Sequence, residues 1–103
     1  MKYKVRVTDR GKQEIQAAAE YIAQDSPEAS QRWRRAIRER ILGLNVFPLR
    51  YGMAPEAQDL EVSLRQMLFG SYRVLYTVTD KEVVVWGIRH SARQPIVPED
   101  LQE

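Results

Sequence analysis

The chain has 103 residues, no cysteine and a single histidine. It can therefore form neither disulfides nor thiolate metal sites, and one histidine argues against zinc. We expect no metal and no cofactor. A long apolar run is also lacking, because the first residues, Met1 to Arg6, alternate charged and apolar side chains. Neither a signal peptide nor a membrane span is predicted, so we expect a soluble, cytoplasmic protein with no membrane partner.

Excess charge of either sign is small, since 16 basic and 14 acidic residues give a formal charge of +2. A strong overall field for nucleic acid is thus not indicated, and the distribution of charge matters more. Residues 28–40 hold five arginines, whereas residues 95–103 hold only acidic charges. Arg34 and Arg38 are like charges one helical turn apart, which favours an acidic partner or a phosphate backbone there. An ordinary solvated face is the alternative, because Glu28 with Arg32 is an i,i+4 pair.

Hydrophobic periodicity predicts one α+β domain with the element order β-α-α-β-β-β. Thr8 and Ser26 are suited to cap two helices, and Pro27 is suited to the first turn of the second. The helices should form an antiparallel hairpin packed on a small antiparallel sheet, to which the first strand adds at an edge. The predicted helices are 9–24 and 27–46, and the predicted strands are 3–7, 60–69, 72–79 and 82–89.

Several details follow from the same pattern. Along 60–69 the alternating apolar residues occupy even positions up to Leu64 and odd positions from Met67. A bulge near Arg65 or Gln66 would account for this change. Gly70 and Ser71 are suited to a two-residue hairpin turn. Residues 1–93 should form the domain, with 94–103 a loosely ordered C-terminal tail. Side chains predicted to be largely buried are Ile37, Ile41, Val74, Tyr76, Val85 and Trp86.

The most informative feature is a buried hairpin, residues 70–93, that carries cations within or just beyond its apolar strands. These cations are Arg73, Arg89, His90 and Arg93. A buried guanidinium without a partner is costly, so Arg73 must either pair with a carboxylate or reach a surface where an anion binds. Glu61 and Glu82 are the candidate carboxylates across the sheet. His90 is suited to acid–base chemistry near neutral pH, although a histidine satisfied by its neighbours is favoured over a catalytic one.

The whole pattern resembles the RelE/ParE superfamily of toxins from type II toxin–antitoxin modules, a group that includes plasmid stabilisation proteins. The resemblance spans residues 3–93. It rests on the Ser-Pro-Glu-Ala start of the second helix at Ser26, on the Gly-x-Tyr-Arg-Val-Leu-Tyr-x-Val run from Gly70, and on the Ile-Arg-His-x-x-Arg ending at Arg93. It implies a growth-arresting toxin neutralised by a cognate antitoxin, with a toxin–antitoxin hetero-oligomer as a possible assembly.

Two activities are known in this superfamily. RelE-like members are metal-independent mRNA interferases that usually cut messages on the ribosome, and ParE-like members are inhibitors of DNA gyrase. If this chain cuts RNA, the resemblance places Arg73 at the phosphate, where a guanidinium fork suits phosphate oxygens. The candidate catalytic residues are then Arg73, His90, Arg65 and Arg93. Candidates for binding nucleic acid or a partner are Arg34, Arg38, Tyr76 and Arg89.

The chain also departs from the RelE pattern. RelE has lysines on the strand before the Tyr-Arg hairpin, where this sequence has Glu61, Ser63, Arg65 and Gln66. RNA-cleaving relatives also carry a tyrosine or histidine near the C-terminus, whereas an acidic tail follows Arg93 here. The His-x-x-Arg ending favours the ParE-like reading, with the mRNA endonuclease as the alternative. Whether the chain is an enzyme stays open, and an inactive homologue that only binds a partner is a further possibility.

Overall fold

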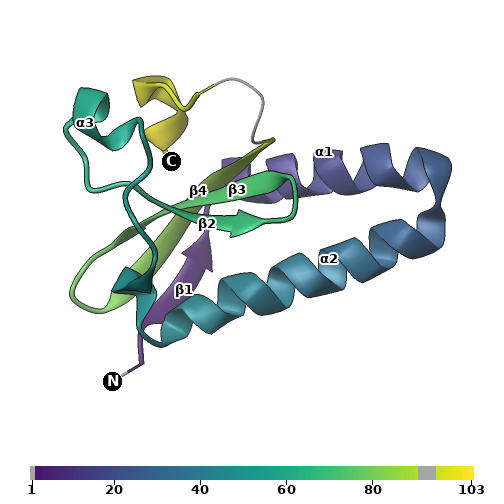
Figure 1. Cartoon of the computed structure of the whole chain (residues 1–103), viewed down its shortest axis with the longest axis horizontal. Coiled ribbons are helices and arrows are strands. Elements are labelled where there is room, and N and C mark those ends of the chain that lie inside the picture. Colours follow the sequence, from purple (N-terminus) through teal and green to yellow (C-terminus); the bar gives the residue numbers. More distant parts are fainter. Residues whose placement is uncertain (1, 91–94) are drawn as a thin grey trace.

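The computed structural model describes residues 2–90 and 95–103. Two long helices form a hairpin that lies against one face of a four-stranded sheet, while a short helix and the C-terminal segment lie against the other (Figure 1). The chain forms, in order, β1 (Lys4–Val7), α1 (Asp9–Asp25), α2 (Pro27–Leu42), 3-10 turns at Gly43–Asn45 and Pro48–Arg50, α3 (Ala57–Leu60), β2 (Arg65–Phe69), β3 (Tyr72–Val78), β4 (Glu82–His90) and a 3-10 turn at Pro98–Leu101.

Both long helices begin where their capping residues predict. The Thr8 hydroxyl accepts a hydrogen bond from the Gly11 amide, and the Ser26 hydroxyl accepts one from the Ala29 amide. Pro27 is the first residue of α2, where its missing N–H is not needed. Helix α2 ends at Leu42, earlier than predicted, and the chain continues as a 3-10 turn to Asn45.

The sheet has the strand order β1-β4-β3-β2. Strands β2, β3 and β4 form the predicted antiparallel meander, and β1 adds at the edge beside β4. The sheet is mixed, however, because β1 runs parallel to β4. Two helices, and not a tight turn, connect β1 to the meander, so no hairpin geometry forces an antiparallel pairing.

Strand β2 is shorter than predicted, and the expected bulge near Arg65 is wrong. Residues 57–60 form the helix α3, and Glu61 ends it with a left-handed backbone, φ 54°. The apolar residues move from even to odd positions because Leu64 packs on one face of the sheet and Met67 on the other. A bulge does occur at Trp86, since Val85 pairs with Tyr76 and Gly87 pairs with Leu75.

Each face of the sheet has its own apolar core. The helix face buries Ile37, Ile41, Val74, Tyr76 and Val85 as predicted. The opposite face, called here the tail face, packs Leu64 and Leu75 against Ala54, Ala57 and Ile96. Trp86 is only half-buried against this second core, and its indole N–H donates to the Thr77 hydroxyl at 2.9 Å.

The C-terminal segment is part of the tail face. Ile96 is only 3% exposed and Asp100 is buried, so the prediction of a loosely ordered tail is wrong for residues 95–103. The proposed division of the chain near residue 93 stays a prediction. Among the helices of residues 2–90 and 95–103, none is both long and apolar enough to cross a membrane.

Candidate functional site

Arg73 and Arg89 lie next to each other on the tail face, because they are paired across β3 and β4. Like charges in directly opposite positions repel, so each guanidinium requires its own counter-ion. For Arg73 this is Glu56, which precedes α3. The Arg73 Nη1 and Nη2 atoms donate to Glu56 Oε1 and Oε2 at 2.9 and 2.7 Å, and Nη1 also donates to Gln66 Oε1 at 3.1 Å. Arg73 thus pairs with a carboxylate, but with neither Glu61 nor Glu82.

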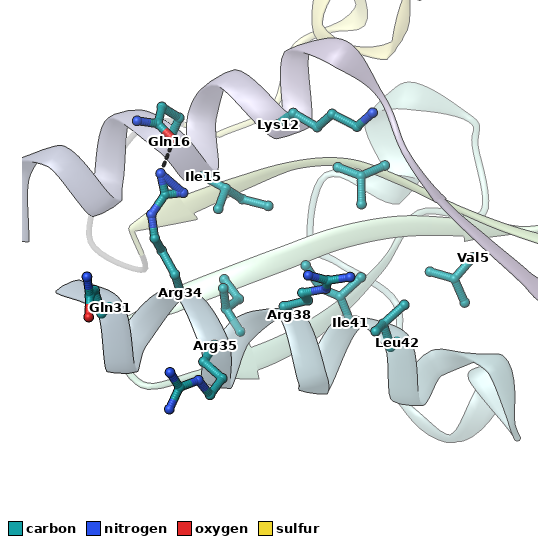
Figure 2. Close-up of a pocket in the computed structure, with 12 residues that line it drawn as sticks. Val5, Lys12, Ile15, Gln16, Gln31, Arg34, Arg35, Arg38, Ile41 and Leu42 are labelled. Carbon is teal, nitrogen blue, oxygen red and sulfur yellow. Dashed lines mark hydrogen bonds between the residues drawn. The ribbon is translucent and has the colours of Figure 1, made fainter. Parts of the chain in front are cut away.

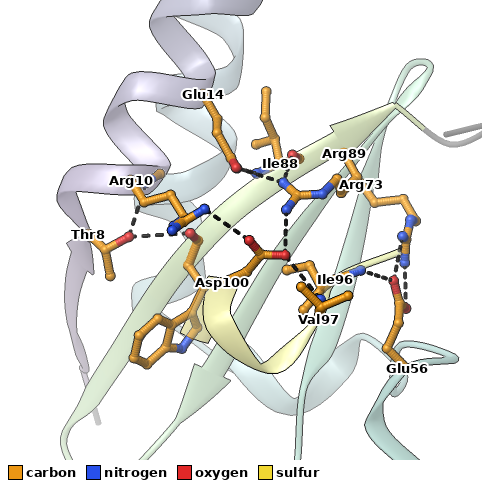
Figure 3. Close-up of polar contacts among 12 residues, drawn as sticks. Thr8, Arg10, Glu14, Glu56, Arg73, Ile88, Arg89, Ile96, Val97 and Asp100 are labelled. Atoms are coloured by element: carbon orange, nitrogen blue, oxygen red, sulfur yellow. Dashed lines mark hydrogen bonds and ion pairs between the residues drawn. The ribbon is translucent and has the colours of Figure 1, made fainter. Parts of the chain in front are cut away.

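The Arg73–Glu56 pair is shielded from solvent. Both residues are 9% exposed, and Glu56 Oε2 also accepts the amide of Ile96 at 3.0 Å. The hydrogen bonds from Arg73 lower the pKa of the Glu56 carboxyl from 4.5 to about 2, against the opposing effect of burial. Glu56 therefore holds the arginine and the C-terminal segment together, as Figure 3 shows.

Arg89 lies between two carboxylates from distant parts of the chain (Figure 3). Its Nη1 is 2.8 Å from Glu14 Oε2 on α1, and its Nη2 is 3.0 Å from Asp100 Oδ2 in the C-terminal segment. Asp100 Oδ1 also pairs with Arg10 at 2.9 Å. Glu14 reaches β4 because residue 87 is glycine, since a Cβ there would lie 2.2 Å from Glu14 Oε1.

This tail-face cluster is balanced in charge. It joins three guanidiniums, of Arg10, Arg73 and Arg89, to the three carboxylates of Glu14, Glu56 and Asp100. Because each cation is already paired, the cluster as folded has no net charge with which to attract a phosphate. Its ion pairs instead fasten α1, the loop before α3 and the C-terminal segment to the sheet.

His90 does not join this cluster. It is paired with Tyr72, the residue before Arg73, so strand alternation directs it to the helix face. Its ring meets the Tyr72 ring edge-on, with centroids 5.4 Å apart, and the Trp33 ring of α2 also meets Tyr72 edge-on at 5.4 Å. Trp33 is half-buried in this aromatic group, as its apolar position predicts. Arg73 and His90 are thus on opposite faces of the sheet.

The remaining candidates from the RNA-cleavage set are also separated. Arg65 Nη1 donates to the Tyr51 carbonyl at 2.6 Å, on the helix face beside Tyr76. Tyr76 is fully buried, its hydroxyl donates to the Pro48 carbonyl at 2.6 Å, and burial raises its pKa to about 12. Arg93 lies outside the described residues. The catalytic roles of Arg65 and Arg93 and the binding role of Tyr76 stay predictions.

Arg34 and Arg38 line a groove of about 790 Å³ between α1, α2 and β1 (Figure 2). Arg34 donates to the Gln16 side chain across the groove, and both arginines are exposed. The apolar lining is Val5, Val7, Ile15, Ile37, Ile41 and Leu42, and the polar lining is Lys12, Gln16, Gln31, Arg34, Arg35 and Arg38. Four cations and no carboxylate thus border an apolar floor, which suits an amphipathic segment that carries acidic residues.

Sequence reasoning identified Arg73 and Arg89 of the tail-face cluster but neither Arg10 nor the carboxylates that pair with these arginines. Arg73 is 17 residues from Glu56, and Arg89 is 11 residues from Asp100. No local spacing rule connects side chains so far apart. Gly87 in a buried strand was the one available signal, because such a glycine often marks a close approach.

Comparison with known proteins agrees with this fold. The family model described as the ParE toxin of the type II toxin–antitoxin system parDE matches residues 5–95. A chain of the chromosomal ParDE system from P. aeruginosa has a similar structure, with a TM-score of 0.69 and 17% identity over 85% of this chain and 95% of that one. A chain of the RelBE2 toxin–antitoxin complex from Mycobacterium tuberculosis gives 0.62 and 24%, over 90% of this chain and 95% of that one. The search of curated proteins gave no significant match. Because the family model covers most of the chain, this protein belongs to the ParE toxin family of type II toxin–antitoxin systems.

Proposed function

We propose that this toxin arrests growth in the cytoplasm by ParE-like inhibition of DNA gyrase, and that it acts by binding without cutting RNA. The observation that carries the proposal is the state of Arg73. RNA cleavage needs a cation aimed at the scissile phosphate and an acid or base on the same side of it. Here Arg73 is buried in a bidentate pair with Glu56, and His90 belongs to the other face of the sheet.

The balanced charge of the tail-face cluster supports the same conclusion. A phosphodiester could reach Arg73 or Arg89 only by displacing Glu56, Glu14 or Asp100. Displacement would also release the Ile96 amide from Glu56 and open the second core. These arginines therefore fit a structural role better than a catalytic one.

A cognate antitoxin is the second partner that we propose, and the groove between α1 and α2 is its binding surface. The similar structures come from toxin–antitoxin systems, and the groove offers an apolar floor with a basic border. Strand β1 is an edge strand, which can accept a strand from another chain. An antitoxin segment with acidic residues around an apolar stripe fits this surface.

Induction of the chain in a bacterial host tests the proposal. Gyrase inhibition predicts filamentation and a DNA-damage response while transcripts initially stay intact. Early arrest of protein synthesis with discrete cuts in messages would instead identify a RelE-like mRNA endonuclease. Normal growth would identify an inactive homologue. The antitoxin is tested separately, by co-purification with the product of the adjacent reading frame and loss of that complex in Arg38→Glu.

A further inference from the structure

Phe47 combines two unfavourable features. Its side chain is 76% exposed, and its backbone is left-handed, with φ 49° and ψ 52°. Left-handed backbone is disfavoured for a residue that carries a side chain, and a residue followed by proline prefers an extended conformation. The chain therefore adopts a strained backbone at a position where an aromatic ring is presented to solvent. Strain of this kind clusters at binding surfaces and other functional sites.

Hydrogen bonds hold the loop that presents Phe47, residues 46–51, in place. The buried Tyr76 hydroxyl donates to the Pro48 carbonyl at 2.6 Å. Arg50 Nη1 donates to the Val46 carbonyl at 2.6 Å and to the Phe47 carbonyl at 3.3 Å. Arg65 donates to the Tyr51 carbonyl from β2. The ring is thus held on a preorganised loop, which lowers the entropy cost of binding through it.

The chain segment that carries Phe47 has the composition of a protein-binding hot spot. Leu49 and Met53, which follow Phe47 in the same segment, are each about half-exposed. Residues 42–55 contain Arg50 and no acidic residue. A segment that combines an exposed aromatic ring, exposed aliphatic side chains and an arginine resembles the energetic centre of a protein interface.

The chemistry favours a protein over a nucleic acid at this loop. Arg50 uses one guanidinium nitrogen for two loop carbonyls, and its guanidinium carbon lies 4.8 Å from the centre of the Tyr51 ring. Arg65 likewise bonds carbonyls of the loop. These cations supply a positive field, but each already directs one guanidinium nitrogen at loop carbonyls and so does not offer its full fork to a phosphate. Leucine and methionine also offer no flat surface for stacking bases.

We propose that Phe47 is the anchor by which the toxin docks into an apolar pocket with an acidic rim on its target protein. The identity of that target, gyrase, rests on the proposed function. The position of the anchor does not, since it follows from the exposure, backbone and surroundings of Phe47. None of residues 46–51 lines the groove between α1 and α2, so the anchor lies outside the surface proposed for the antitoxin.

Phe47→Asn is the decisive variant, because asparagine tolerates the left-handed backbone and the exposed ring contributes little packing. Tyr21→Ser is the matched control, since Tyr21 is 69% exposed on α1. Phe47→Trp should restore the anchor. Each variant is assayed for growth arrest on induction and, after purification, for inhibition of gyrase supercoiling. Thermal unfolding confirms that each variant is folded.

We expect Phe47→Asn to inhibit supercoiling at least about tenfold more weakly, whereas Tyr21→Ser and Phe47→Trp act like the parent chain. A folded Phe47→Asn variant with full growth arrest would overturn the anchor. If the parent chain arrests growth without affecting supercoiling, the proposed function fails, and the anchor then stands only if Phe47→Asn relieves the arrest. Loss of binding to a single-stranded oligonucleotide in Phe47→Asn would overturn the protein pocket in favour of base stacking. A parent chain that does not arrest growth would overturn both proposals.

Discussion

The ion pair between Arg73 and Glu56 should make the stability of this fold depend on acid pH. The Glu56 carboxyl has a folded-state pKa of about 2, below its ordinary value of 4.5. Its ionised form therefore stabilises the fold at pH values above the unfolded-state pKa. At about 1.36 kcal/mol per unit, the shift corresponds to roughly 3 kcal/mol. This stabilisation should be complete near neutral pH and should be lost as pH falls from about 4.5 towards about 2.

Glu56→Gln removes the charge while it keeps one oxygen for Arg73 or the Ile96 amide. Breaking one partner of a buried pair typically costs about 3–5 kcal/mol, because the other charge remains buried. We expect a loss of about 3 kcal/mol at pH 7, measured by urea unfolding, and a weaker dependence of stability on pH below 4.5. The double variant Glu56→Gln with Arg73→Met should regain much of the loss, because it leaves no unpaired cation. A loss under about 1 kcal/mol, or an unchanged pH profile, would refute the reasoning.

Two further substitutions test contacts around the strands. Gly87→Ala should cost about 1–3 kcal/mol, because its Cβ displaces Glu14 from β4, whereas Gly43→Ala, with no atom within 4 Å of its Cβ, is the matched control. Equal urea midpoints for the two variants would contradict the close approach. Tyr76→Phe should lower the free energy of unfolding by about 1–3 kcal/mol, because the Pro48 carbonyl loses its donor. An ultraviolet titration of this variant should lack the tyrosine whose pKa is raised to about 12. An unchanged titration would show that Tyr76 is not the shifted group.

The elements with local signals could be predicted from sequence. Thr8, Ser26 and Pro27 mark the helix starts through bonds within three residues, and Gly70 marks a turn that requires its positive φ of 57°. The buried hairpin was predictable because two adjacent strands were apolar on both faces. These features depend on neighbours in the chain, so the sequence alone contains the information.

Errors occurred where distant segments decide the structure. The sequence predicts a strand from residue 60, but residues 57–60 form a short helix whose apolar side chains complete the second core with Ile96. The acidic tail looks solvated, yet Asp100 is drawn to Arg89 and Arg10 across the sheet. The sequence left open whether Arg73 pairs with a carboxylate or reaches a bound anion, because Glu56 approaches it only through the fold of the intervening loop.

Purified chain tested side by side against gyrase and against translated messenger RNA is the most direct test of the proposed target. The account predicts that supercoiling is inhibited at concentrations where messages on ribosomes remain uncut. Arg73→Ala, if it remains folded, should not change RNA levels in this assay, because the arginine has a structural role. The account is contradicted if messages are cut while supercoiling stays normal and folded Arg73→Ala no longer cuts them. Arg73 would then be the phosphate-binding residue of a ribonuclease.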